Sequence, residues 1–523
     1  MADRSPTVAV VGGGIAGLSA AWELCGGGAS VTAATHRPAV VVLESEPRAG
    51  GRLLAAPFAG RTVDLGADAF VARRPEATDL CRELGLDEDL VPPGAAGASV
   101  WARGDLRALP RALNLGVPTR WWPLARSRIL TTGETLAVAG DLFRPHRRPE
   151  PVFGDRAVGE IVGDRLGRPV VDRLTDPMVG GIHAGSADEL SAAALVPLLI
   201  AADAQPGSLL RRLRRAQEPT EDGTPVFLSL RTSTASLADR LADALRLRGV
   251  EIRLATRVVA VEANTAVTGA RFRLSLQSSA GSNGRASEAE VGRYVGGRWE
   301  SPMLEVDALV VATDAGQAAV LLAPLAPVAA GLLSAVDHAS VATITLALPP
   351  GTVGDRPGTG FLVPRTSLVG GRVPLVTACT YLDRKWPHLR VDHADLVRLS
   401  VGRHRDERHT DLDDDELVET ATGELALMLG AAPPPRPAEA LVTRWPAAFP
   451  QYAVGHLVGV ARMMEDVNTV GGLAVAGAAL RGVGIPACVS SGRQAARRVL
   501  DSLAAAADRA PAGRPDSSGP GAG

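Results

Sequence analysis

Three glycines near the start of the sequence, Gly12, Gly14 and Gly17, have the spacing of a loop that holds the phosphates of a dinucleotide. They follow an apolar run at residues 8–11 and precede a segment of helical character at residues 18–24. The first glycine permits a tight turn, the second lets the backbone approach a pyrophosphate, and the third allows close helix packing. The N–H groups that open the helix would then face the phosphates. The pattern predicts a dinucleotide site, although a purely structural glycine turn has the same spacing.

Glu44 gives this interpretation independent support. It ends a second apolar run, residues 40–43, where a carboxylate can accept hydrogen bonds from both ribose hydroxyls. Its separation from Gly17 exceeds the usual spacing of ~20 residues, and a glycine-rich insertion at residues 26–38 accounts for the excess. We therefore expect Glu44 to bind the ribose of the dinucleotide.

A βαβ unit over the first fifty residues would bring these groups to one edge of a parallel sheet. Near the other end of the chain, residues 473–477 form an apolar run that ends in glycine, and residues 489–500 have helical character. The turn between them would aim a helix N-terminus at the cofactor, so we expect Val483, Gly484 and Ile485 to contact it. Cys488 is interpreted as a buried core residue, because no cysteine or histidine lies near it in the sequence.

Composition excludes several classes of function. The chain has 523 residues, of which 46% are hydrophobic, and its 55 basic and 57 acidic residues leave a net charge of −2. No basic field is therefore available to bind nucleic acid. The 4 cysteines are scattered without a CxxC pair, which argues against a disulfide framework or a metal site and suits a reducing compartment. With no secretory signal pattern at the N-terminus, we expect a cytoplasmic protein.

One uncharged run, residues 315–336, is long enough to cross a bilayer. It contains Gln317 and two prolines, Pro324 and Pro327, which fit poorly in a membrane span. We therefore expect a loop and buried helices there.

The residues after Glu44 distinguish between cofactors. Residues 44–52, which include the paired glycines Gly50 and Gly51 and then Arg52, resemble the segment after the ribose-binding acid in FAD enzymes such as amine oxidases, phytoene desaturases and protoporphyrinogen oxidases. Residues 63–68 resemble the segment along the flavin in the same enzymes. The alternative for Arg52 is a basic surface turn. The resemblance implies FAD rather than NAD.

Four further segments resemble a narrower family: residues 176–191, 360–364, 385–388 and 450–456. They are similar to stretches of oxygen-dependent protoporphyrinogen oxidases and of the coproporphyrinogen III oxidases of bacterial haem synthesis. Together with the two FAD segments the resemblance covers residues 8–500. The absence of a mitochondrial-type leader and the arginine- and alanine-rich composition favour the bacterial coproporphyrinogen branch.

This resemblance implies the residues that would contact FAD. They are Gly12, Gly13, Gly14, Ile15, Ala16, Gly17, Glu44, Ser45, Arg52, Gly66, Ala67, Asp68, Ala69, Val258, Val483, Gly484 and Ile485. The sequence also departs from the family's pattern. Thr232 and Ser233 replace paired glycines before a helix, Leu457 stands where some relatives have tryptophan, and no arginine lies near Ser99 to bind a propionate.

The resemblance also implies the architecture. The fold class is α/β, with a Rossmann-type FAD-binding domain, an interleaved α+β substrate-binding domain and a helical subdomain, as in amine-oxidase-like flavoproteins. The expected parts are residues 1–90, 224–320 and 437–503 for FAD binding, 91–223 for the helical part and the first substrate-binding part, 321–436 for the second substrate-binding part, and 504–523 for a disordered tail.

The implied activity is oxidation of coproporphyrinogen III to coproporphyrin III, with six electrons passing by way of FAD to three O2 and forming three H2O2. Because the flavin does the difficult chemistry, no catalytic acid or base is assigned, and His183 and His456 are interpreted as structural. The alternatives are a protoporphyrinogen IX oxidase, an amine oxidase or carotenoid desaturase, and a non-catalytic porphyrin-binding flavoprotein. An amine oxidase that needs a lysine at the flavin has one candidate, Lys385, the only lysine in the chain.

The expected partners are the porphyrinogen and O2, and no nucleic acid. The pair Trp121 and Trp122 would suit either weak membrane contact or helix packing. Contact with other haem-synthesis enzymes is a further hypothesis that the sequence leaves open.

Overall fold

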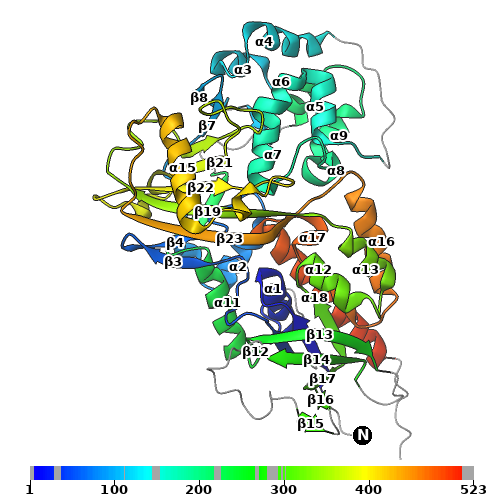
Figure 1. Ribbon diagram of the computed structural model, residues 1–523. Helices are drawn as coiled ribbons and strands as arrows, with labels where there is room; N and C mark the ends of the chain where they lie inside the picture. Colours follow the sequence, from blue (N-terminus) through cyan, green and yellow to red (C-terminus); the bar gives the residue numbers. More distant parts are fainter. Residues whose placement is uncertain are drawn as a thin grey trace, which may run out of the picture.

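A five-stranded, fully parallel sheet forms the base of the protein in the computed structural model (Figure 1). The structure describes residues 5–28, 37–110, 112–143, 154–216, 225–264, 270–278, 293–295, 298–300 and 302–508. The sheet order is β12–β2–β1–β18–β24, and the strands are β1 (Thr7–Val11), β2 (Ala39–Leu43), β12 (Glu251–Arg253), β18 (Ala308–Val311) and β24 (Leu473–Val475). All four residues of β18 are buried, as expected for a parallel strand covered on both faces.

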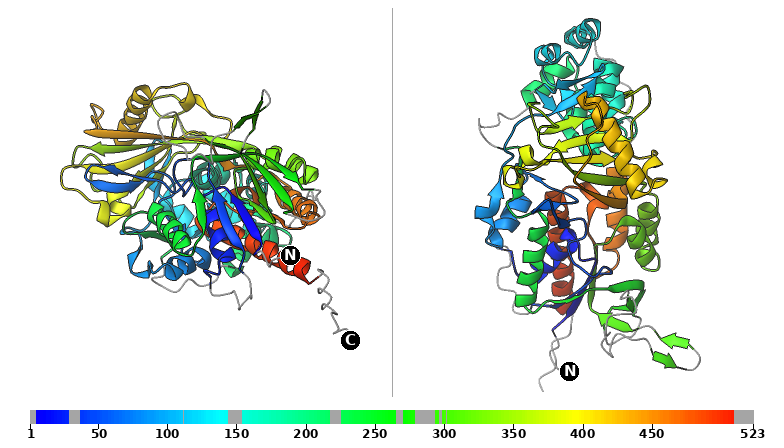
Figure 2. Two further views of the ribbon diagram at one scale, coloured as in Figure 1. Left: turned by 90° about the horizontal axis from the view of Figure 1, so that it is seen from below. Right: turned by 60° about the vertical axis from the view of Figure 1, so that its left-hand side comes forward.

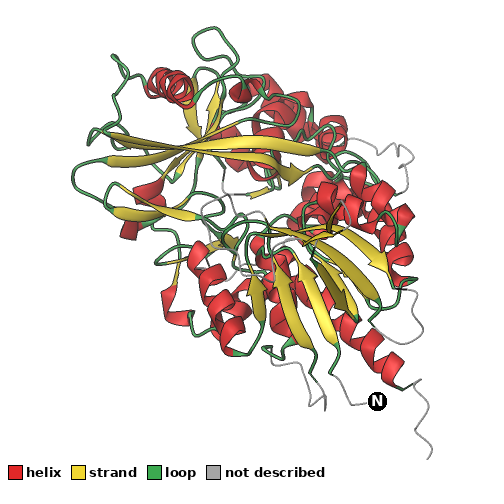
Figure 3. Cartoon of the chain, turned by 60° about the horizontal axis from the view of Figure 1, so that its bottom comes forward, coloured by secondary structure: helices red, strands yellow, loops and turns green. Residues whose placement is uncertain are grey.

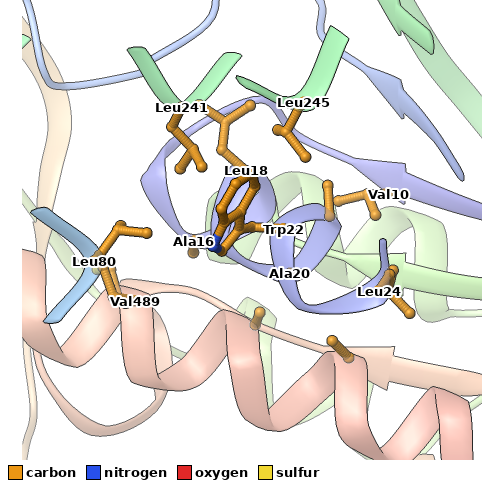
Figure 4. Packing of buried hydrophobic residues seen from close by; sticks show 14 of the residues in the cluster. Val10, Ala16, Leu18, Ala20, Trp22, Leu24, Leu80, Leu241, Leu245 and Val489 are labelled. Atoms are coloured by element: carbon orange, nitrogen blue, oxygen red, sulfur yellow. The ribbon is translucent and has the colours of Figure 1, made fainter. Parts of the chain in front are cut away.

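One face of this sheet is covered by α1 (Ile15–Leu24), α11 (Ala235–Leu247) and α18 (Ile485–Ala507), which lie side by side in Figure 2 (right). Figure 4 shows Leu18 and Trp22 of α1 among Leu241, Leu245 and Val489. The helices α1 and α18 pack closely because Gly492 has no side chain: a Cβ there would lie 2.0 Å from the Ala16 carbonyl oxygen.

The opposite face is covered by three helices and a small antiparallel sheet (Figure 3). The helices are α12 (Ala315–Leu322), α13 (Pro327–Ser334) and α16 (His456–Asn468), and the strands are β13 (Thr256–Ala263), β14 (Phe272–Ser278) and β17 (Met303–Val306). The uncharged run at residues 315–336 therefore forms two short, packed helices, as expected. Among the described residues, no helix is long and apolar enough to span a membrane.

A seven-stranded sheet forms the second layer of the molecule, and its order is β23–β19–β22–β21–β20–β7–β8. Its strands are β7 (Ser99–Ala102), β8 (Asp105–Ala108), β19 (His338–Leu348), β20 (Gly360–Leu362), β21 (Val376–Tyr381), β22 (Asp395–Val401) and β23 (Glu439–Pro450). Every pair is antiparallel except β7 with β20. The helix α15 (Asp414–Leu429) packs on this sheet through Leu417, Ala421 and Leu425.

Short helices form the third part, at the top of Figure 1. They are α3 (Trp121–Ser127), α4 (Thr132–Ala139), α5 (Val158–Leu166), α6 (Arg168–Val170), α7 (Asp176–His183), α8 (Ala192–Leu195), α9 (Pro197–Asp203) and α10 (Leu209–Ala216). A buried ion pair, Arg165 to Asp141 at 2.7 Å, lies within this group. Asp141 also accepts hydrogen bonds from Ser208 and from the backbone of Leu210, so its charge is fully satisfied.

The remaining elements connect these parts. They are β3 (Ala55–Phe58), β4 (Arg61–Asp64), β5 (Phe70–Val71), α2 (Pro75–Glu83), β6 (Leu90–Val91), β9 (Leu113–Asn114), β10 (Val117–Pro118), β11 (Phe227–Leu230), β15 (Arg293–Val295), β16 (Arg298–Glu300), α14 (Leu382–Lys385) and α17 (Ala478–Arg481).

The structure shifts three of the expected boundaries. The helices α12 and α13 pack on the parallel sheet, so that part continues beyond residue 320. The strand β23 belongs to the seven-stranded sheet, so the third cofactor segment begins after Pro450 rather than at residue 437. The helix α18 runs on to Ala507, beyond the expected end at residue 503, and Leu503 is its last residue that packs on the core. The rest of the expected tail, residues 509–523, lies outside the described residues.

Candidate cofactor site

A cavity of about 430 Å³ lies where the parallel strands of the base sheet end. Its wall includes residues that follow the ends of these strands by one or two positions: Gly12 after β1, Glu44 after β2, Ala312 after β18 and Gly477 after β24. The carboxyl edge of a parallel sheet is the usual position of a ligand site in this kind of fold.

The cavity brings together most of the residues expected to contact the cofactor, although these came from distant parts of the sequence. The expected residues that line it are Gly12, Gly14, Ile15, Ala16, Glu44, Ser45, Arg52, Ala67, Val258, Val483 and Ile485. The expected residues that are not among its lining are Gly13, Gly17, Gly66, Asp68, Ala69 and Gly484.

The glycines of the loop are required for two different reasons. Gly12 has a φ of +107°, and a Cβ on Gly17 would lie 1.9 Å from the Gly12 carbonyl oxygen, so both positions need glycine for the turn itself. Gly14 differs, because a Cβ there would meet no atom within 4 Å. Gly14 therefore leaves open space in the cavity wall, which is what a group that approaches the backbone requires.

Glu44 is held at the cavity by backbone amides. Its Oε2 accepts a hydrogen bond from the N–H of Gly13 at 2.6 Å, and its Oε1 accepts one from the N–H of Glu46 at 2.8 Å. This explains the place of Gly13, which orients the carboxylate from behind rather than lining the cavity. Each carboxylate oxygen retains acceptor capacity for a sugar hydroxyl.

Arg52 supplies positive charge to the cavity. Its Nη2 donates to the Ala447 carbonyl at 2.9 Å, and Arg52 forms no ion pair within the part of the chain that the structure describes. Burial lowers the pKa of Arg52, and nearby Asp314 opposes this effect. A partly desolvated guanidinium without a paired carboxylate is stabilised by an anionic ligand.

Two helices begin at the cavity without a side-chain cap. The N-cap of α1 is Gly14 and that of α18 is Gly484, and neither helix start donates a hydrogen bond to a capping side chain. Their N–H groups are therefore available to a ligand, and the positive ends of both helices favour negative charge. With open Gly14 and Arg52, these helix starts fit the diphosphate of a dinucleotide.

Asp68 lies beside the cavity but is directed away from it. Each oxygen of its carboxylate accepts a hydrogen bond from Lys385 Nζ at 2.9 Å. Its Oδ2 also accepts one from Trp386 Nε1 at 3.1 Å. Burial alone would raise the pKa of Asp68, but Lys385 and Arg398 lower it to about 2. Lys385 is thereby engaged and is not among the residues that line the cavity.

Gly66 and Asp64 hold together the backbone segments next to Asp68. A Cβ on Gly66 would lie 2.1 Å from the Arg52 carbonyl oxygen, so glycine permits the close approach of the two segments. Asp64 accepts hydrogen bonds from the N–H and the hydroxyl of Thr234, at 3.0 and 2.9 Å. Asp64 therefore ties the end of β4 to the start of α11. Burial raises the pKa of Asp64 to about 6.

The two histidines that we interpreted as structural are outside the cavity lining. The Nε2 of His456 forms a hydrogen bond of 2.8 Å with the Leu480 carbonyl oxygen. Its ring stacks on that of Tyr452, with the ring centroids 4.3 Å apart. Burial lowers the pKa of His183 to about 4, so this ring is neutral near pH 7.

Sequence reasoning missed several residues of the cavity wall, including Asp314, Gln317, His338 and Pro450. The position of Asp314 just after β18 was a usable signal, since the carboxyl ends of neighbouring parallel strands meet at one edge. No local signal marks His338, whereas Pro450 opens the segment 450–456 that the sequence singled out by its resemblance, although it was not among the residues expected to contact the cofactor. They begin β19 and end β23, opposite each other in the seven-stranded sheet, and reach the cavity only through the contact between the two layers.

Comparison with known proteins agrees with this geometry. The family model of flavin containing amine oxidoreductases matches residues 15–500. The chain is 32% identical to a coproporphyrinogen III oxidase of Propionibacterium freudenreichii subsp. freudenreichii, over 96% of this chain and 92% of that protein. It is 33% identical to one of Mycobacterium tuberculosis (strain ATCC 25618 / H37Rv), over 94% and 97%. A crystal structure from Exiguobacterium sp. 255-15, described as a protoporphyrinogen oxidase, superposes with a TM-score of 0.78 at 28% identity, over 96% and 99%.

Proposed function

This chain belongs to the flavin-containing amine oxidoreductase family, and from that membership we propose that it is a coproporphyrinogen III oxidase. It is an FAD-dependent oxidoreductase. The observation that carries the choice of substrate is the near full-length similarity, at 32% and 33% identity, to proteins named coproporphyrinogen III oxidase. The proposed reaction removes six electrons and six protons from the porphyrinogen and reduces three O2 to three H2O2.

FAD would supply the electron acceptor for hydride removal from the porphyrinogen. We propose that its diphosphate lies against Gly14, Arg52 and the start of α1, and that Glu44 binds a ribose. The start of α18, at Val483 to Ile485, would stabilise negative charge on the reduced ring. The full set of proposed contacts is Gly12, Gly13, Gly14, Ile15, Ala16, Gly17, Glu44, Ser45, Arg52, Gly66, Ala67, Asp68, Ala69, Val258, Val483, Gly484 and Ile485.

The structure also bears on the amine-oxidase alternative. In that alternative a lysine assists at the flavin, and Lys385 is the only lysine in the chain. Both of its hydrogen bonds to Asp68 lie outside the cavity, so it is not available for that role. Lys385 therefore supplies no amine to the cavity, and we propose a reaction in which the protein positions the substrate and excludes water.

The deciding experiment supplies the purified FAD-loaded protein with coproporphyrinogen III and, separately, with protoporphyrinogen IX. Porphyrin fluorescence and peroxide are followed against a blank without protein. We expect faster oxidation of coproporphyrinogen, with one H2O2 for each electron pair. A preference for protoporphyrinogen would assign the sister activity, and rates equal to the blank for both would remove the oxidase assignment and favour a porphyrin-binding role.

Location and contacts of the protein are part of the proposal. We propose that it acts in the cytoplasm and touches membranes weakly through Trp121 and Trp122, whose exposed fractions are 37% and 52%. The two rings contact each other edge to face at 5.2 Å, and Arg126 lies over Trp122. Sedimentation with anionic vesicles, compared between the native protein and a Trp121→Ser/Trp122→Ser variant, tests the membrane contact.

Co-purification with other haem-synthesis enzymes tests for protein partners.

A further inference from the structure

Of the histidines that the structure describes, only His338 lines the cofactor cavity. It begins β19 and is half-buried, and it shares its part of the wall with Arg52, Asp314 and Pro450. No motif in the sequence assigns this residue a role. Its imidazole is nevertheless a titratable group placed within the site proposed for a strongly anionic cofactor.

The start of β19 is fixed by hydrogen bonds of His338 and of the preceding residue, Asp337. Its N–H donates to Asp337 Oδ1 at 3.0 Å, and the Asp337 carbonyl accepts the N–H of Gln451 at 2.8 Å. The other carboxylate oxygen of Asp337 is bound to His404 Nε2 at 2.7 Å, while His404 Nδ1 contacts Glu189 at 3.1 Å. These contacts hold the start of β19 against the segment after β23, so the imidazole stays at the cavity wall.

The charges around His338 come from several elements. Burial lowers its pKa most, a hydrogen bond to the Val336 backbone raises it, Arg52 lowers it, and Asp314 and Asp337 raise it. Glu44, Glu46, Arg257 and Cys488 are the other titratable groups of the cavity lining. Asp314 is already engaged, since it accepts the N–H of Gln317 at 2.9 Å at the start of α12. Without a ligand the balance at His338 favours the neutral imidazole.

We propose that His338 is a proton-coupled binding residue for FAD, which takes up a proton as the anionic part of the cofactor enters the cavity. Together with Arg52 and Arg257, the protonated ring would give the cavity a third cationic group for a diphosphate that carries two negative charges. The inference rests on the binding of FAD and not on the identity of the substrate.

The direction of the pH effect follows from linkage. Because the anion stabilises the imidazolium, the pKa of His338 is higher in the FAD complex than in the FAD-free protein. FAD affinity is therefore greatest below the lower of the two pKa values and decreases as the pH rises through the higher one. For one coupled proton, the dissociation constant increases by up to ~10-fold per pH unit inside that window.

The test measures FAD binding rather than turnover. Full-length protein is freed of FAD and titrated with FAD from pH 5.5 to 8.5, with quenching of flavin fluorescence as the readout. His338→Gln removes the titrating group, and His338→Arg replaces it by a permanent cation. His393→Gln, at an exposed histidine that is absent from the cavity lining, is the matched control.

We expect the native protein and His393→Gln to lose affinity as the pH rises, and His338→Gln to bind weakly with a flat profile. His338→Arg should bind tightly with a flat profile. An unchanged slope in His338→Gln would overturn the proposal. Calorimetry of the native protein in two buffers of different ionisation enthalpy counts the protons directly, so the proposal stays testable if a variant fails to fold. Uptake of no proton anywhere between pH 5.5 and 8.5 also overturns it.

These outcomes are separate from those of the proposed function. Failure of the porphyrinogen assay with normal, pH-dependent FAD binding would reject the substrate and leave His338 in its role. Normal oxidase activity with pH-independent FAD binding would support the substrate and reject the role of His338.

Discussion

Lys385 donates from its Nζ to both carboxylate oxygens of Asp68, each at 2.9 Å. The pair joins the segment after β4 to α14, and Trp386 Nε1 completes the coordination of the carboxylate. Both side chains are mostly buried, with exposed fractions of 20% and 16%. The only lysine of the chain thus stabilises the contact between the two layers instead of serving the cofactor.

Replacing Lys385 with Met should destabilise the protein, because Asp68 would keep a buried charge with only Arg398 nearby, at 3.7 Å. Loss of one partner from a buried pair costs about 3 kcal/mol. Urea unfolding of the FAD-loaded protein measures this. Adding Asp68→Asn to the same variant should restore part of the stability, since the uncompensated charge is then removed. A free energy of unfolding unchanged by Lys385→Met would contradict this view of the pair.

Replacing Gly14 with Leu should abolish FAD binding without unfolding the protein. The position has a φ that any residue adopts, and a Cβ meets no neighbour within 4 Å, so the side chain would project into the cavity. The variant is expected to keep its far-ultraviolet circular dichroism and to lose the visible absorbance of bound flavin. Gly331→Leu, at a glycine of α13 with equally open surroundings, is the control and should retain both. Full flavin content in Gly14→Leu would refute the placement of the diphosphate.

The contribution of Asp64 to the free energy of unfolding should decrease as the pH rises through 6. Burial raises the pKa of Asp64 from 3.8 to about 6, so the folded state holds this proton more tightly than the unfolded state does. Its contribution to stability is complete below pH ~4 and is lost by pH ~7, a change of about 3 kcal/mol at 1.36 kcal/mol per pKa unit. Unfolding free energies at pH 4, 5, 6 and 7 should therefore fall more in the native protein than in Asp64→Asn. Parallel profiles for the two proteins would exclude the effect.

Thiol reagents should not react with the folded, FAD-loaded protein near pH 7.5. All four cysteines are buried. Burial raises the pKa of Cys81 to about 12 and that of Cys488 to about 11, and it also raises the pKa values of Cys25 and Cys379. A colorimetric disulfide reagent should detect all four thiols only in guanidinium. After removal of FAD we expect Cys488 alone to become reactive, because it lines the cavity. Equal reactivity with and without FAD would argue that the cofactor lies elsewhere.

The sequence predicted that the parts of the site that lie close together in the chain would share one place in the fold. The loop from Gly12 to Gly17 and the acid Glu44 belong to one βαβ unit, whose hydrogen bonds and turns are local, and the structure places both at one cavity. The sequence was less informative about the direction in which a side chain points. Asp68 lies in a segment beside the cavity, as expected, but its side chain turns to Lys385, a partner more than three hundred positions away in the chain.

Residues contributed by the second layer could not be found in this way. His338 reaches the cavity because β19 pairs with β23 and because Asp337 is bound to His404. Each of these contacts joins segments far apart in the sequence, and none leaves a periodic pattern or a motif. The same reason explains the boundary at residue 437, since the composition of β23 gives no indication of which sheet it joins.

The order of strands in the base sheet has a consequence for biosynthesis. The central strand β1 emerges from the ribosome early, but its neighbour β18 pairs on the far side with β24, which is made last of the five. At ~5–20 residues per second, tens of seconds separate the first strand from the last. During that time the apolar face of α1 lacks α18, and the cavity lacks one of its walls. The complete cavity therefore forms only once residues 473–488 have been made, and β18 is without its partner β24 until then.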